Sequence, residues 1–342
     1  MDNISKLNES FSVGFWTPYL YTQRGNATTA KRIISGLQAE GHHVEAFAYE
    51  EEKWTSTIQS RMTACDVYHV LHFNRFAAWM NERKERLNKP YLVTSGGTDV
   101  NEHMEESHSK RLLEDAEALT VFTQESAQRV LSVYPQFKEK LHVIPQSVYI
   151  PEKNEAPTVS FPKGSPNVLL PAGLREVKDV FHVFGCLERL QKVYPALKFM
   201  IVGESLDSEV LARVEQLEQE FSWFHYAGSM PIEQMTYVYG WADIVLNTSI
   251  SEGQSIAIME AMYYGVPVIA RANGGNKSLI SHGMNGYIYE DERTFERLFV
   301  QLLNNRNLYQ TFSEKGKEII SREFSVKKEI ENYMKIYKQL MR

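Results

Sequence analysis

The sequence has little of what marks secreted, membrane-spanning or nucleic-acid-binding proteins. Its two cysteines, Cys65 and Cys186, stand far apart in a chain of 342 residues, so the composition fits a reducing compartment and no disulfide framework. No apolar run approaches the roughly 20 residues of a membrane-spanning helix, and residues 1–4 lack the apolar core of a signal peptide. The formal net charge of −6 favours no nucleic-acid partner. We therefore expect a soluble, cytoplasmic protein.

Two motifs for metals and dinucleotides are also absent. Asp-x-Asp, a common metal-binding carboxylate pair, does not occur, and no Gly-x-Gly-x-x-Gly follows a predicted strand. The densest acidic run, residues 290–292, follows a turn and is expected to be solvated. The sequence therefore predicts neither a metal site nor a resident cofactor, and a nicotinamide-dependent enzyme is the weakest of the alternatives.

The pattern that is present is an alternation of apolar strands with amphipathic helices, interrupted once. This alternation predicts an α/β fold with two doubly wound, Rossmann-like domains. Residues 151–166 are rich in proline and lack periodicity, which indicates a linker. We place an N-terminal domain at residues 1–150, a second domain at 167–322 and an amphipathic C-terminal helix within 323–342.

A strand–helix–strand unit in the second half carries the most informative residues. Residues 244–249 form a predicted buried strand, and a second apolar strand follows at 266–270. Between them, Ser255 is a good N-cap for a helix and Gly265 a good terminator. We expect Ile256, Met259 and Tyr263 to share one face of that helix.

Two glutamates flank the start of this predicted helix. Glu252 lies in the loop before it, and Glu260 lies roughly 7–8 Å along the helix axis. The free N–H groups of the first helical turn bind anions, so a diphosphate there would place a sugar near Glu252 and a ribose near Glu260. Taken alone, Glu260 has an ordinary alternative as a solvated helix glutamate.

The spacing of Glu252 and Glu260 resembles the Glu-x7-Glu signature of retaining GT-B glycosyltransferases, the class called glycosyl transferases group 1. The resemblance implies that Glu252 binds the donor sugar and Glu260 the nucleotide ribose. It also implies donor contacts for the intervening residues, Gly253, Gln254, Ser255 and Ile256. The family usually has an aromatic or apolar residue and then Gly or Pro where this chain has Gln254 and Ser255.

A second motif follows the first strand of the second half. Gly173, Arg175 and Lys178 are similar to the family's Gly-x-Arg-x-x-Lys motif, in which both cations hold the donor pyrophosphate. Fixed cations stabilise the charge that develops on a leaving diphosphate. A solvated charged loop is the alternative. No carboxylate pair suggests a nucleophile and an acid, so Arg175, Lys178 and Glu252 are the predicted catalytic residues.

The first half offers candidates for the acceptor side and the cleft floor. Gly25 and Asn26 follow the first strand, where the family has a Gly-rich loop, although a plain turn would have the same pattern. Polar residues stand at the carboxyl ends of two further predicted strands, at 66–75 and 90–95, where open α/β sheets bind ligands. These acceptor-side candidates are His72, Asn74, Gly97, Thr98 and Asp99. His72 has an alternative as a hydrogen-bonded structural residue. Residues 24–26 and 95–101 also resemble one small branch of the family.

The resemblance implies a C-terminal helix that crosses back to the first domain. It also implies transfer of a hexosyl group from a nucleotide-sugar to an acceptor hydroxyl with retention, without a metal. A UDP-sugar is favoured and a GDP-sugar is possible. The acceptor would be a sugar, glycan, protein or small molecule. Two alternatives stay open: another GT-B chemistry, such as epimerisation or phosphorolysis, and a non-catalytic nucleotide-sugar-binding protein.

Overall fold

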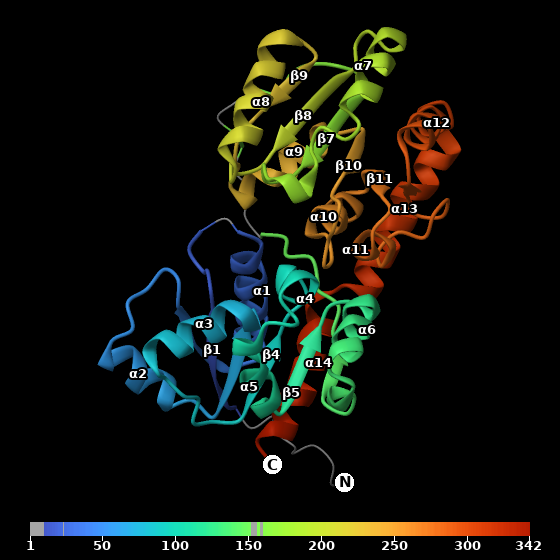
Figure 1. Ribbon diagram of the computed structural model, residues 1–342. Helices are drawn as coiled ribbons and strands as arrows, with labels where there is room; N and C mark the ends of the chain where they lie inside the picture. The colour runs from blue at the N-terminus through green and yellow to red at the C-terminus, as the bar shows by residue number, and fades with distance from the viewer. Residues whose placement is uncertain (1–9, 23, 152–155, 158–159) are drawn as a thin grey trace, which may run out of the picture. The chain divides into compact units, whose positions relative to one another are not determined.

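The computed structural model describes residues 10–342 except residues 23, 152–155 and 158–159, and the Thr98 side chain is also left undescribed. The chain forms two compact units (Figure 1). Unit 1 contains Met1–Ser147 together with Val326–Arg342, and unit 2 contains Val148–Ser325. The predicted linker at 151–166 includes undescribed residues, and its role as a linker stays a prediction.

Unit 1 is built on a parallel sheet of six strands. Their order is β2 (His43–Ala48), β1 (Ser12–Thr17), β3 (Val67–Leu71), β4 (Tyr91–Thr94), β5 (Ala118–Val121), β6 (Leu141–Val143). The chain runs from β1 outward to β2 and then returns past β1 to β3. The strand order therefore reverses between β1 and β3, which is where such sheets bind ligands.

Helices cover both faces of this sheet because apolar side chains point alternately to either side along each strand. Phe15 packs with α1 and α14, and its neighbour Trp16 packs in the opposite cluster with α2, α3, α5 and α6. The helix bounds are α1 (Gly25–Ala39), α2 (Ser56–Thr63), α3 (Phe73–Arg83), α4 (Thr98–Glu102), α5 (Ser107–Asp115), α6 (Gln124–Val133), α14 (Val326–Leu340). One 3₁₀ turn, η1, spans Pro135–Phe137.

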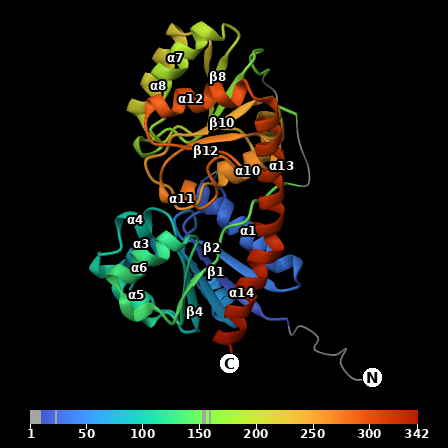
Figure 2. The same cartoon turned by 90° about the vertical axis from the view of Figure 1, so that its right-hand side faces the viewer.

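The C-terminal helix α14 belongs to unit 1, although it ends the chain (Figure 2). Gly36 lets α14 approach α1 closely, because a Cβ there would lie 2.5 Å from Ile330 Cγ1. The buried Arg32 guanidinium pairs with Glu329 at 2.8 Å, and the Tyr337 hydroxyl lies 2.6 Å from His69 Nδ1. The predicted return of the last helix to the first domain is confirmed.

Unit 2 has a second parallel sheet of six strands. Their order is β12 (Tyr287–Tyr289), β11 (Val268–Arg271), β10 (Ile244–Asn247), β7 (Asn167–Pro171), β8 (Lys198–Val202), β9 (Phe224–Tyr226). Here the order reverses between β7 and β10. Strand β12, only three residues long, was not predicted.

Two apolar clusters fill the two faces of this sheet. Val168 and Leu170 of β7 face α7, α8 and α12, whereas Leu169 faces α9, α10 and α13. The helix bounds are α7 (Phe184–Val193), α8 (Ser208–Glu220), α9 (Met235–Trp241), α10 (Ile256–Tyr264), α11 (Gly274–Lys277), α12 (Glu292–Leu303), α13 (Arg306–Glu323). The 3₁₀ turns are η2 (Glu176–Lys178) and η3 (Ile232–Gln234). The predicted α/β class with two doubly wound sheets is confirmed.

Two predicted elements differ in extent. The strand predicted at 66–75 ends at Leu71, because His72 takes a left-handed conformation with φ 72° and α3 begins at the next residue. Gly25 and Asn26 were predicted in a loop, but they open helix α1. Among the described residues, no helix is long and apolar enough to cross a membrane.

Candidate functional site

The strongest candidate site lies at the switch point of unit 2. Turn η2 follows β7, and the loop that leads into α10 follows β10, so both begin at the carboxyl ends of the two strands that flank the reversal. The Ser255 hydroxyl accepts from the Ile258 N–H at 3.4 Å and caps α10. Gly265 ends the helix with φ 75°. The predicted strand–loop–helix–strand unit is confirmed with both of its capping residues.

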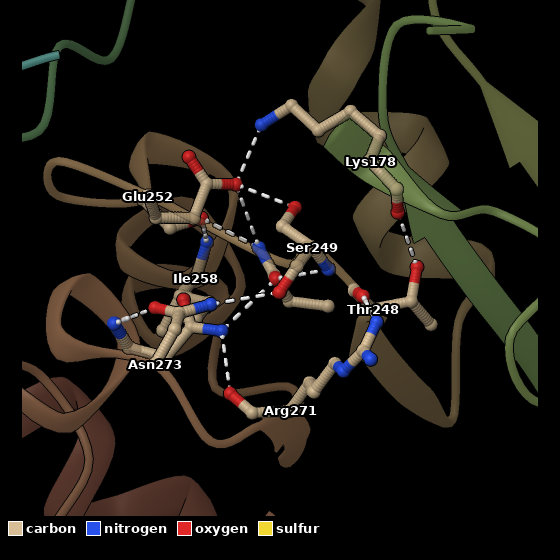
Figure 3. Close-up of polar contacts among 10 residues, drawn as sticks. Lys178, Thr248, Ser249, Glu252, Ile258, Arg271 and Asn273 are labelled. Atoms are coloured by element: carbon tan, nitrogen blue, oxygen red, sulfur yellow. Dashed lines mark hydrogen bonds and ion pairs between the residues drawn. The ribbon is translucent and has the colours of Figure 1, made fainter. Parts of the chain in front are cut away.

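Lys178 and Glu252 form an ion pair in this site (Figure 3). The Lys178 ammonium lies 2.5 Å from Glu252 Oε1, and both side chains are largely buried. The same oxygen accepts from the Ser249 hydroxyl at 2.8 Å and from Asn247 Nδ2 at 3.3 Å. Burial raises the pKa of Glu252. Lys178 and these hydrogen bonds together lower it by more than burial raises it, so the pKa lies below its usual value. Glu252 is therefore an anion at neutral pH.

Three asparagines fix the backbone around Glu252. Asn247 Nδ2 donates to the Ser255 hydroxyl at 3.0 Å, and Asn247 Oδ1 accepts from Asn276 Nδ2 at 3.0 Å. Asn273 Nδ2 donates to the Ser249 carbonyl at 2.8 Å. None of the three was among the predicted site residues. Of the three, only Asn247 could have been found from the sequence, because it is a polar residue at the end of the apolar strand β10.

The turn that carries Lys178 is tied to the β10–α10 loop through its backbone. The Thr248 hydroxyl donates to the Lys178 carbonyl at 2.8 Å, and the Ile250 N–H donates to the Val177 carbonyl at 2.9 Å. Arg271, at the end of β11, pairs with Asp179 at 2.6 Å. Asp179 itself has φ 40°, in the left-handed region. Arg271 and Asp179 were not predicted, because their pairing depends on the strand order.

Arg175 differs from Lys178 in having no partner. Its side chain is exposed, and no residue in the described part of the chain bonds to its guanidinium. Gly173, two residues earlier, lies close to the loop after β8, because a Cβ there would lie 3.2 Å from Leu206 Cδ1. Of the two predicted cations, Lys178 is held in place and Arg175 is uncommitted.

Glu260 lies half-buried on α10, on the same helix that Ser255 caps. The Tyr239 hydroxyl donates to Glu260 Oε2 at 2.7 Å, and the Tyr239 ring stacks on Tyr264. Burial raises the pKa of Glu260 to about 7, against a smaller lowering by the Tyr239 hydroxyl. The alternative of a solvated helix glutamate is therefore wrong. Tyr263, predicted on the buried face of this helix, is 42% exposed.

The other predicted donor residues line the loop and the first turn of α10. Gln254 and Ser255 are buried, whereas Gly253 and Ile256 are half-buried. The backbone of Glu252 lies directly against α11. A Cβ on Gly275 would be 2.6 Å from the Glu252 carbonyl oxygen. Gly275 therefore makes room for the Glu252 loop.

The predicted residues of unit 1 form two separate groups. Asn26 and the exposed Gly25 lie in the first turn of α1, preceded by Arg24, whose guanidinium lies 4.4 Å from the centre of the Tyr19 ring. Asn74 Oδ1 accepts from the Ser109 hydroxyl at 3.3 Å, which ties α3 to α5.

His72 and Asp99 come together from adjacent strands. His72 Nδ1 lies 3.8 Å from Asp99 Oδ2, and Asp99 Oδ1 accepts from the Gly97 and Val100 N–H groups at 3.1 and 3.0 Å. Burial, only partly opposed by Asp99, lowers the pKa of His72. Gly96 leaves no room for a side chain, because a Cβ there would lie 2.5 Å from the Phe122 ring. The Thr98 side chain lies outside the described residues.

In chemical terms, unit 2 presents two cations and a helix N-terminus beside two carboxylates. Cations and free N–H groups bind phosphate oxygens, and carboxylates accept hydrogen bonds from hydroxyls. Within the described part of the chain, no cluster of His, Cys, Asp and Glu could hold a metal ion.

The part of the chain that carries this arrangement matches a known family. Residues 152–319 match the family described as glycosyl transferases group 1. This part of the chain, which contains Arg175, Lys178, Glu252 and Glu260, matches that family, as the two motifs predicted.

One relative matches along nearly the whole chain. Glycosyltransferase 1 domain-containing protein 1 of Xenopus tropicalis is 27% identical over 331 residues, which cover 92% of this chain and 94% of that protein. It belongs to the branch that residues 24–26 and 95–101 resemble.

Two solved structures show the same GT-B fold. Sucrose-phosphate synthase of Thermosynechococcus elongatus has a TM-score of 0.79 at 16% identity and covers 96% of this chain and 99% of its own. HepE of Anabaena, in complex with UDP and glucose, has a TM-score of 0.72 at 16% identity, with coverage of 96% and 99%.

Proposed function

We propose that the protein is a retaining glycosyltransferase that moves a hexosyl group from a nucleotide-sugar to an acceptor hydroxyl. The observation that carries the proposal is the convergence of Lys178 and Glu252 on the switch point of unit 2, 2.5 Å apart, beside the start of α10. A donor diphosphate needs positive charge, and a donor sugar needs hydroxyl acceptors. Both are present within a few ångströms.

Each charged group has a distinct role in this proposal. Lys178 and Arg175 bind the diphosphate and stabilise the charge that develops on it as the glycosidic bond breaks. Glu252 uses Oε1 to hold Lys178, and its Oε2, which no described residue contacts, accepts hydroxyls of the transferred sugar. Glu260 accepts the ribose hydroxyls, with Tyr239 orienting its carboxylate.

The existing ion pair favours a mechanism without a metal. Glu252 holds the Lys178 ammonium, and the Thr248 hydroxyl holds the Lys178 backbone carbonyl, before any ligand binds. Its charge is thus already in place when the leaving group forms, which is the condition for electrostatic stabilisation without reorganisation. With no nucleophilic carboxylate assigned, the leaving phosphate itself takes the acceptor proton on the same face of the sugar.

A UDP-sugar is the favoured donor, with a GDP-sugar as the second choice. HepE, which shares the fold, was solved with UDP and glucose. The acceptor meets unit 1 through His72, Asn74 and the segment 97–99, and it is a sugar, glycan, protein or small molecule. The whole reaction is expected in the cytoplasm, without a resident cofactor.

A ligand screen tests this proposal. UDP, GDP, UDP-glucose and GDP-mannose are added to the full-length protein, and thermal stability and nucleoside diphosphate release are recorded. A nucleotide at about 100 times its Kd should stabilise the fold by roughly 2.7 kcal/mol. Release of diphosphate supports transfer. Binding without release indicates a non-catalytic binder. Release without transfer of the sugar to water or to an added acceptor indicates an epimerase-like or phosphorolytic chemistry. No stabilisation by any nucleotide contradicts the proposal.

A further inference from the structure

Unit 1 contains a groove that extends well beyond the predicted acceptor residues. It has a volume of about 700 Å³ and is lined by residues 49–53 after β2, by α3, and by His103 and His108 after β4. His72 and Asn74 are the two predicted residues in its wall. Grooves of roughly 300–1,000 Å³ at the carboxyl ends of parallel strands are typical small-molecule sites.

The charges in the groove are mixed and nearly balanced. Four glutamates line it, at positions 50, 51, 52 and 82, against Lys53, Arg75 and Arg83. With the histidines neutral, the formal charge is three minus four, or −1. Polyanions and phosphorylated ligands would meet the four carboxylates without a surplus of cations, so this lining does not favour them.

The lining also does not favour a lipid. The aromatic residues in the wall, Tyr49 and Trp79, are only 3% and 5% exposed, so little apolar surface reaches the groove. Glu50 and Lys53 are exposed, and within the described residues neither side chain has a hydrogen-bond or ion-pair partner. A carboxylate can accept a hydrogen bond from a hydroxyl, and an ammonium group can donate one to it. These two unpaired side chains therefore suit a ligand that is rich in hydroxyls.

His72 supplies a second, independent indication of a ligand. Its side chain is 7% exposed, yet it lines the groove. Nδ1 accepts from the Arg75 N–H at 3.5 Å and lies 3.8 Å from Asp99 Oδ2, whereas Nε2 bonds to no described residue. The residue also holds φ 72°, a conformation that is sparsely populated for histidine and that clusters at functional sites.

We propose that this groove binds the acceptor, that the acceptor is a neutral saccharide, and that His72 Nε2 hydrogen-bonds one of its hydroxyls. The role of this saccharide as the acceptor rests on the proposed function, whereas its binding in the groove does not depend on that function. Because Nδ1 accepts from the Arg75 N–H, the neutral His72 ring carries its proton on Nε2 and donates it to the saccharide hydroxyl. Asp99, whose Oδ1 is anchored by backbone N–H groups, lies beside the ring without hydrogen-bonding it.

Two tryptophan substitutions on α3 test the location. Ala78 is exposed and lines the groove, so Ala78→Trp fills it without removing a polar group. Asn81 is exposed on the same helix and does not line the groove, so Asn81→Trp is the matched control. Saturation-transfer NMR on the full-length protein uses glucose, N-acetylglucosamine and maltose as neutral probes and glucose 6-phosphate as the charged probe.

We expect at least one neutral probe to bind the wild type and Asn81→Trp, and its signal to be lost in Ala78→Trp. His72→Ala should weaken that probe about two- to tenfold, the usual range for one hydrogen bond, and His72→Gln should recover part of the loss. The proposal is overturned if Ala78→Trp retains the signal, if glucose 6-phosphate binds and the neutral probes do not, or if no neutral probe binds.

A parallel measurement separates this proposal from the proposed function. UDP binding and diphosphate release depend on unit 2, so both should be unchanged in Ala78→Trp when no acceptor is added. UDP binding without any saccharide signal contradicts saccharide binding in the groove and leaves the proposed function in place. A saccharide signal without nucleotide binding contradicts the glycosyltransferase activity and leaves the groove in place.

Discussion

The Lys178 ammonium lies 2.5 Å from Glu252 Oε1, although the two residues are 74 positions apart in the chain. One follows β7 and the other follows β10, and these strands are neighbours because the sheet order reverses between them. The pair joins the two motifs that the sequence presented separately. It also means that the proposed phosphate-binding cation is already oriented by the proposed sugar-binding carboxylate.

The first prediction concerns the cation of this pair. Lys178→Ala removes a group that we propose stabilises the leaving diphosphate, and losing one such group typically lowers kcat about a hundredfold to a thousandfold. Lys192→Ala is the matched control, since Lys192 is 70% exposed and pairs with Glu188 on the same helix. Steady-state kinetics with and without a chelator check the assignment. If chelation abolishes wild-type activity and a divalent metal restores it, Lys178 and Arg175 are not the main diphosphate clamp.

The second prediction concerns pH. Burial raises the pKa of Glu260 to about 7, and the ionised form is the better acceptor for two ribose hydroxyls. Nucleotide affinity should therefore rise by about tenfold per pH unit below pH 7 and level off above it. Calorimetric titration of UDP between pH 5.5 and 8.5 measures this. Glu260→Gln should bind more weakly and lose the pH dependence, and an identical pH profile in both proteins would exclude the ribose role.

The same pKa shift affects the stability of the free protein. The folded pKa of Glu260 lies above the ordinary value of 4.5, so its contribution is fully present below about pH 4.5 and is lost as pH rises through 7. Bound nucleotide should reverse this trend, because it favours the carboxylate. Comparing the pH dependence of unfolding for the wild type and Glu260→Gln isolates this one group from the other titrating residues.

The third prediction uses the close contact behind Glu252. Gly275→Ala places a methyl group 2.6 Å from the Glu252 carbonyl oxygen, so the loop must shift and the Lys178–Glu252 geometry with it. A displacement of about 1 Å can reduce turnover about a hundredfold. Gly240→Ala is the control, because its Cβ meets nothing within 4 Å. Equal activity in the two variants would show that the position of the Glu252 loop does not limit catalysis.

The fourth prediction concerns the attachment of α14. Glu329 accepts from Arg32 and from the Ser147 hydroxyl while only 2% exposed. Removing one member of a buried ion pair typically costs about 3–5 kcal/mol. Glu329→Ala should lower the free energy of unfolding of unit 1 by about that amount in a urea titration. Glu318→Ala breaks an exposed pair and should change it by less than about 1 kcal/mol. Similar losses would mean that the buried pair does not anchor the helix.

The unit around α10 was predictable because local signals sufficed. The apolar strands, the Ser255 cap and the Gly265 terminator lie within thirty residues and do not depend on the rest of the fold. The amphipathic face of α14 was predictable for the same reason. Ile330, Tyr333 and Tyr337 repeat at helical spacing, and all three are buried.

What the sequence did not predict depends on contacts between distant segments. The pairing of Lys178 with Glu252, the Arg271–Asp179 pair and the asparagine network all follow from strand order, which periodicity does not encode. The Gly25 region was mispredicted for another reason. A loop was expected there by resemblance, but Arg24, with φ −95° and ψ 153°, is the N-cap of α1, and the helix begins at Gly25.

In the proposed function, the site of unit 2 transfers a sugar from a nucleotide-sugar with retention. Proton NMR of the full-length protein with UDP-glucose or GDP-mannose, followed from the first turnovers, tests it most directly, because water can serve as the acceptor. The account predicts slow release of the diphosphate and a first-formed sugar with the same anomeric configuration as the donor, with both signals absent in Lys178→Ala. A first-formed product of inverted configuration, or no cleavage of either donor by the wild type, would contradict it.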